Sequence, residues 1–119
     1  MLFWVGGFGA DMASMGGRTE GIGTLLAGAV DTAWSSSTLS FGPLATRTPS
    51  PSWLAAHPTL DVVYAAHEGA GTVAAYRRSD VLRLLPIGRP LAVGDSPCHI
   101  AVAPDGTFMV VSCYGDGRV

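Results

Sequence analysis

The chain repeats itself at an offset of 46 residues. Residues 52–73, SWLAAHPTLDVVYAAHEGAGTV, align without gaps with residues 98–119, CHIAVAPDGTFMVVSCYGDGRV, and five of the 22 aligned positions are identical. Each copy reads as an apolar strand, a turn that contains proline, a second apolar strand, a Gly-x-Gly turn and the start of a third strand. Any fold of this chain must therefore place similar β-units one after another.

A period of about 40–50 residues built from short strands is typical of the blades of a β-propeller. We predict an all-β fold, a β-propeller of four-stranded antiparallel blades. The 119 residues supply about two and a half blades, whereas propellers close with about four to eight. We expect an incomplete ring, either the N-terminal part of a longer protein or a truncated product, because Val119 falls inside an expected strand. The remaining blades would be needed for closure, since each blade buries its apolar face on its neighbours.

We expect one domain whose blades span residues 1–48, 49–94 and, incompletely, 95–119. Turn residues and apolar runs predict strands in all three. In the first blade, the expected strands are Leu2–Gly7, Ile22–Gly28 and Leu39–Ala45, with a Gly-rich loop after the first. In the second and third, they are Trp53–His57, Asp61–His67, Thr72–Arg77, a stretch within Leu82–Val93, His99–Ala103 and Phe108–Cys113. The alternative for residues 22–34 is a short helix.

Composition excludes several classes of protein. Hydrophobic residues make up 48% of the chain and charged residues only 13%, which argues against disorder. The net charge of −2 offers no basic surface for nucleic acid. The longest apolar stretch, residues 21–30, is far shorter than the ~20 residues of a membrane span, and the amino end lacks the basic region of a signal peptide. We expect a cytoplasmic protein without a membrane partner.

The two cysteines, Cys98 and Cys113, do not form a metal motif. If Asp105-Gly106 forms a two-residue hairpin turn, they lie directly opposite each other across the ladder. A disulfide is one interpretation. Two reduced, buried thiols are the other, which a cytosolic location favours.

Hairpin geometry predicts which polar and aromatic side chains meet. The start of the first strand and the end of the second lie at the same end of a blade, so Trp53 accompanies Glu68 in the second blade and His99 accompanies Tyr114 in the third. The first strand of each blade lines the central channel of a propeller. We therefore expect these four side chains around one mouth of the channel, where loops converge and ligands bind. His57 is expected in a surface turn at the opposite end.

The segments PSWLAAHPTLDVVYAAHEGAGTVAAYRR and SPCHIAVAPDGTFMVVSCYGDGRV resemble the lactonase family of seven-bladed β-propellers. The motifs that carry the resemblance are Pro-Ser-Trp-Leu, an aromatic strand ending in glutamate before Gly-x-Gly, and P-x-H-x-x-x-x-P-D-G followed by an apolar strand ending in Tyr-Gly-x-Gly. The resemblance covers nearly the whole chain, best over residues 51–119. The family often has asparagine where this chain has His67 and Cys113, a departure that bears on the substrate.

The resemblance implies a hydrolase of carbohydrate metabolism that converts 6-phosphogluconolactone to 6-phosphogluconate, in the pentose phosphate pathway, without a metal or other cofactor. Its partner is then a small lactone or sugar phosphate, although we expect this chain alone to be weakly active or inactive. One alternative is a relative that cyclises muconates. Another is a non-enzymatic propeller that binds a ligand or a protein, because one fold hosts many functions.

Opening a lactone requires attack by water, proton transfer and stabilisation of the oxyanion. His99 has a side chain suited to acid or base work near neutral pH, and Glu68 would orient it or act as the base. Trp53 and Tyr114 would contact the substrate. The structural alternatives are that His99 bonds between blades, that Glu68 caps backbone donors, and that the two aromatic residues pack between blades.

A phosphorylated substrate also requires cationic partners. The chain has no lysine, and three of its arginines, Arg77, Arg78 and Arg83, are expected on outer strands. Arg118 begins a third strand and is expected outside the channel lining. Phosphate-binding cations are therefore expected from the remaining blades.

Overall fold

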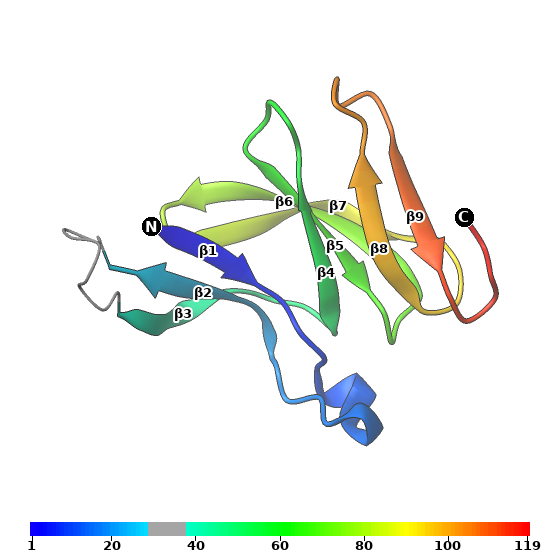
Figure 1. Ribbon diagram of the computed structural model, residues 1–119, viewed down its shortest axis with the longest axis horizontal. Coiled ribbons are helices and arrows are strands. Elements are labelled where there is room, and N and C mark those ends of the chain that lie inside the picture. The colour runs from blue at the N-terminus through cyan, green and yellow to red at the C-terminus, as the bar shows by residue number, and fades with distance from the viewer. Residues whose placement is uncertain (29–37) are drawn as a thin grey trace.

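The structure is a computed structural model that describes residues 1–28 and 38–119. This part of the chain contains nine strands and one short 3-10 helix. The strands form three antiparallel sheets that lie side by side without closing into a ring (Figure 1). Each of the nine strands corresponds to one that the sequence predicts. The architecture is that of an incomplete β-propeller. No helix in the described residues is long and apolar enough to cross a membrane.

The first sheet has the order β1-β2-β3, with β1 at Leu2–Val5, β2 at Gly21–Ala27 and β3 at Leu39–Arg47. The helical alternative for residues 22–34 is wrong for the part that the structure describes, because β2 pairs with a strand on each side. Ile22 in this strand is fully buried. Residues 29–34 of that alternative lie outside the described residues.

The second sheet is a meander of four strands in sequence order. It contains β4 (Pro51–Ala56), β5 (Val62–His67), β6 (Thr72–Asp80) and β7 (Arg83–Ala92). β7 carries Pro86 and Pro90 and lies at the edge of the sheet, which is where a strand tolerates proline. The third sheet is the hairpin of β8 (Pro97–Val102) and β9 (Met109–Cys113).

Two apolar cores join the sheets. β5 contributes side chains to both cores, because successive side chains of a strand point to opposite faces. Val63 and Ala65 face the first sheet and pack with Ile22, whereas Ala66 faces the third sheet and packs with Ile100. Many of the buried residues are alanines, whose small side chains let the sheets approach closely. This packing brings β4 against β8, the first strands of the second and third sheets.

The loop after β1 differs from the sequence expectation, because it contains a 3-10 helix, η1, at Ala10–Met15. Gly16 ends the helix in the left-handed region, at φ 78°, and its N–H donates to the carbonyl of Ala13. Glycine adopts this conformation without a steric penalty. The glycines that predicted an irregular loop therefore flank a helical turn.

The expectation that Cys98 and Cys113 lie directly opposite each other is wrong. From His99 to Val102 the register is the expected one, but a β-bulge between Pro97 and His99 places Cys113 opposite Pro97. Both cysteines are free, and the Sγ of Cys98 lies 3.6 Å from the carbonyl oxygen of Ser112. Burial raises the pKa of the Cys113 thiol, and the charge of Asp116 adds to that effect.

Candidate functional site

Trp53 and His99 meet where β4 contacts β8. Their ring centroids are 4.4 Å apart and their planes are tilted by 52°. The indole Nε1–H of Trp53 also donates to the carbonyl oxygen of Ile100, at 3.1 Å. Both side chains remain partly open to solvent, with 40% of Trp53 exposed. Two of the four residues that the sequence predicts at the channel mouth are therefore in contact in the structure.

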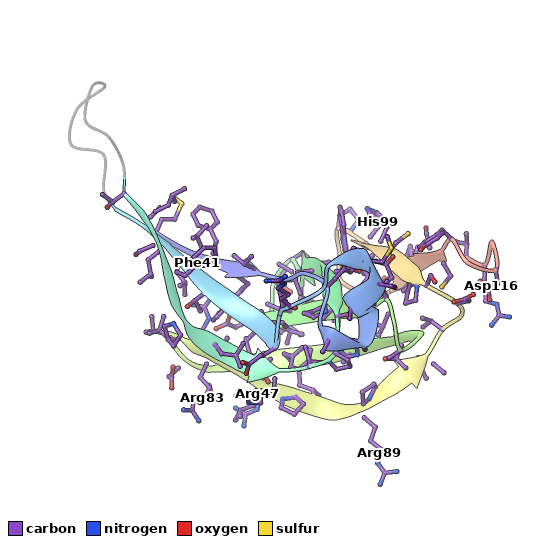
Figure 2. The ribbon with its side chains drawn as sticks, turned by 90° about the horizontal axis from the view of Figure 1, so that it is seen from below. Phe41, Arg47, Arg83, Arg89, His99 and Asp116 are labelled. Carbon is purple, nitrogen blue, oxygen red and sulfur yellow. The ribbon has the colours of Figure 1, made fainter. Side chains whose placement is uncertain are left out.

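The pair lies on the inner side of the sheets. Figure 2 shows His99 on the side away from the outer strand β7, from which Arg83 and Arg89 project in the opposite direction. In a closed propeller this inner side is the wall of the channel. An exposed imidazole on that wall is able to exchange protons with a ligand in the channel.

Glu68 and Tyr114 lie at the ends of β5 and β9, at the same end of the sheets as the starts of β4 and β8. Glu68 is only 7% exposed, whereas Tyr114 is 63% exposed. Within the described residues no hydrogen bond joins Glu68 to His99, and the hydrogen bond recorded for Glu68 is made by its backbone N–H. The strands share this end as expected, and the ring contact recorded among the four residues in the described part of the chain is that of Trp53 with His99.

A Ser-Pro corner precedes the inner strand in each of the two sheets. Ser50 and Ser96 both have positive φ angles, 32° and 55°. The carbonyl of Ser50 accepts a hydrogen bond from the N–H of Glu68, and the carbonyl of Ser96 accepts one from the N–H of Tyr114, each at 3.2 Å. Non-glycine residues avoid this conformation, and strained backbone is concentrated at functional sites. The corner fixes the start of the first strand against the end of the second.

A bulge follows the corner in both sheets. The register shifts between Pro51 and Trp53 and again between Pro97 and His99. A bulge redirects the side chains that follow it. The sequence analysis missed these corners, although Ser-Pro occurs at 50–51 and at 96–97, at the same 46-residue offset as the rest of the repeat.

The loop that carries η1 is held against the first corner. The Oγ of Ser50 donates to the Oδ1 of Asp11 at 2.6 Å and accepts from the N–H of Gly9 at 2.8 Å. The carboxylate of Asp11 also lies against Gly69, where no space is left for a Cβ atom. This loop thus covers the turn that follows Glu68, and Asp11 is a polar residue of this region that the sequence analysis did not identify.

A buried polar cluster connects the first two sheets beside this turn. The Nε2 of His67 lies 2.7 Å from the Oγ1 of Thr48 and 3.1 Å from the hydroxyl of Tyr76, and its Nδ1 lies 3.0 Å from the Oγ1 of Thr72. Burial lowers the pKa of His67, although the negative charge of Asp11 opposes this. Burial also raises the pKa of Tyr76, against the effect of its hydrogen bond to Thr48. Both side chains are therefore neutral near pH 7.

The stability of the protein should therefore fall in mild acid. The unfolded chain binds a proton at His67 near pH 6.5, whereas the folded protein binds it only at a lower pH, so acidification through this range favours unfolding. We expect the free energy of unfolding in urea to decrease as the pH falls from about 7.5 to about 5.5. The His67→Gln variant, which does not titrate, should show a smaller decrease. An equal decrease in both proteins would contradict the assignment to His67.

Three of the arginines named from the sequence contact residues other than the Trp53–His99 pair. Arg78 lies 5.4 Å from the ring centroid of Trp4 and 3.3 Å from Asp61. Arg83 lies 4.0 Å from Asp80, and Arg118 lies 3.5 Å from Asp116. Arg77 is exposed on β6. Within the described residues, no group of three or more His, Cys, Asp or Glu side chains is placed to hold a metal ion.

A cavity of about 600 Å³ lies on the first sheet, lined by Arg18, Glu20, Phe41 and Arg47 among others. It does not include the inner-strand pair. Figure 2 places Arg47 close to the outer side and far from His99. Trp53 and His99 are exposed to solvent, and the described sheets do not close into a ring around them.

A family model described as Lactonase, 7-bladed beta-propeller, matches residues 12–119. The match includes all three sheets except β1. No curated protein and no solved structure gives a significant match to the chain.

Proposed function

Because this chain belongs to the lactonase family of seven-bladed β-propellers, we propose that it takes part in the hydrolysis of 6-phosphogluconolactone to 6-phosphogluconate. Family membership supports a lactonase-type hydrolase. The substrate is our proposal. The observation that carries the proposed hydrolysis is the exposed imidazole of His99, which lies on the inner side of β8 and packs against Trp53.

The proposed reaction uses water and one acid–base group. His99 takes a proton from a water molecule, and the resulting hydroxide attacks the lactone carbonyl. The ring C–O bond then breaks, and the imidazolium of His99 returns its proton to the departing ring oxygen. The product is an open-chain hydroxy acid, so atoms and charge balance without a further reactant.

The other inner-side groups suit binding of the ligand. Tyr114 is exposed at the end of β9 and carries a hydroxyl that bonds sugar oxygens. Glu68 is buried beside the corner at Ser50. Its role would be to hold the turn that follows β5 in position beside the ligand. A cytoplasmic location would fit this substrate.

The stable product, 6-phosphogluconate, tests where the ligand binds. We expect titration of the ¹⁵N-labelled chain to shift the resonances of the Trp53 indole N–H, His99 and Tyr114, with a dissociation constant on the order of 1 mM. Binding is weak because the described sheets wall only part of a channel. Shifts that cluster instead on β7, or no shifts at millimolar ligand, would contradict the proposal. Shifts produced equally by unrelated small anions would favour a general binding role.

A further inference from the structure

The indole of Trp53 is fixed at two points. Its backbone belongs to β4, and its Nε1–H donates to the carbonyl of Ile100 in β8, at 3.1 Å. Ile100 is 3% exposed and belongs to the apolar core between the second and third sheets. A side chain held by its own strand and by a neighbouring, well-packed strand has little freedom to turn.

His99 is held differently. Within the described residues, no hydrogen bond is recorded for its ring, and its recorded ring contact is the indole at 4.4 Å. Tilted aromatic pairs at this distance are attractive and have a preferred geometry. The orientation of the imidazole therefore depends on the rigid indole beside it.

The repeat explains how the two rings come to face each other. Trp53 and His99 occupy the same position in successive sheets, each directly after a Ser-Pro corner and a bulge. The packing of β4 against β8 then brings the two equivalent positions together.

We propose that Trp53 is a positioning residue that holds the imidazole of His99 toward the channel, and that it does not stack on the substrate. The proposal rests on the proposed function only in assigning proton transfer to His99. Orientation of an acid–base group affects the chemical step, because proton transfer requires the donor and acceptor within hydrogen-bond reach. Loss of the indole should therefore lower kcat and leave KM nearly unchanged.

The first readout needs no substrate. The ring current of the indole should shift the His99 ring protons upfield in the ¹H spectrum of the chain. We expect this shift to disappear in Trp53→Leu and to remain, at reduced size, in Trp53→Phe, which keeps a ring but loses the hydrogen bond to Ile100. An unshifted His99 resonance in the unmodified chain would overturn the proposal whatever the activity.

The second readout is the separation of kcat from KM. We expect Trp53→Leu to lower kcat about 10-fold and to leave KM nearly unchanged, because an indirect role acts through His99 and not through contact with the substrate. Trp53→Phe should retain most of the activity and guards against a result caused by misfolding. A rise in KM with an unchanged kcat would show that Trp53 contacts the substrate and would overturn the proposal. Absence of lactone hydrolysis with a shifted His99 resonance would contradict the proposed function alone.

Discussion

Replacing Ser96 with glycine is expected to raise the free energy of unfolding by about 1 kcal/mol. Ser96 has a φ of 55°, which is unfavourable for a residue with a Cβ atom, and it precedes Pro97, which restricts it further. Its hydroxyl bonds the neighbouring carboxylate of Asp95 at an exposed position, so little is lost with the side chain. Ser96→Ala keeps the strain and should leave the stability unchanged in urea unfolding.

The same replacement at the equivalent corner should have the opposite sign. Ser50 has a φ of 32°, but it is fully buried and its hydroxyl bonds both Gly9 and Asp11. We expect Ser50→Ala to lower the free energy of unfolding by about 2 kcal/mol, because it leaves the buried N–H of Gly9 without a partner. Ser50→Gly also relieves the backbone and should lower it by about 1 kcal/mol. If Ser50→Gly stabilises as much as Ser96→Gly, the hydroxyl does not hold the η1 loop.

Replacing His99 with asparagine is expected to lower kcat/KM for 6-phosphogluconolactone by about 10²-fold, which is the lower end of the usual contribution of an acid–base group. An amide still packs beside Trp53 and forms hydrogen bonds, but it does not accept a proton near neutral pH. The measurement is the initial rate of acid release, corrected for the uncatalysed opening of the lactone. An undiminished rate in His99→Asn would remove His99 from the mechanism.

A histidine at the other end of the neighbouring second sheet provides the control. His57 lies in the turn between β4 and β5, where its Nδ1 accepts from the N–H groups of Thr59 and Leu60 at 3.1 and 3.0 Å. Asparagine makes the same kind of turn bond, so His57→Asn should fold normally and keep the full rate. A loss in both variants would indicate a general effect of removing a histidine.

Most of the fold follows from local pattern. Apolar runs, turn residues and the 46-residue repeat predict all nine strands. These local signals suffice because each strand pairs with its neighbour in sequence. The facing of Cys98 and Cys113 was predicted incorrectly. The register counted from the hairpin turn was right up to His99, and one extra residue at the bulge then shifted the partner of Cys113 to Pro97.

The candidate site was predictable only in part. Hairpin geometry placed Trp53 with Glu68 and His99 with Tyr114 at one end of the blades, since strand direction determines which ends coincide. The direct contact of Trp53 with His99 depends on how two sheets pack, which strand patterns do not specify. The hydrogen bonds of Ser50 to the η1 loop also join segments about forty residues apart in the sequence, and local patterns do not predict such contacts.

The rate of 6-phosphogluconolactone hydrolysis with the unmodified chain, compared with the uncatalysed rate in the same buffer, tests the central claim most directly. We predict an acceleration of about 10²-fold. This is small beside the ~10⁶-fold or more of typical enzymes, because His99 acts on an incompletely walled channel. The acceleration should be lost in His99→Asn and kept in His57→Asn. A rate equal to that of the uncatalysed reaction would contradict the assignment of lactone hydrolysis to the Trp53–His99 pair.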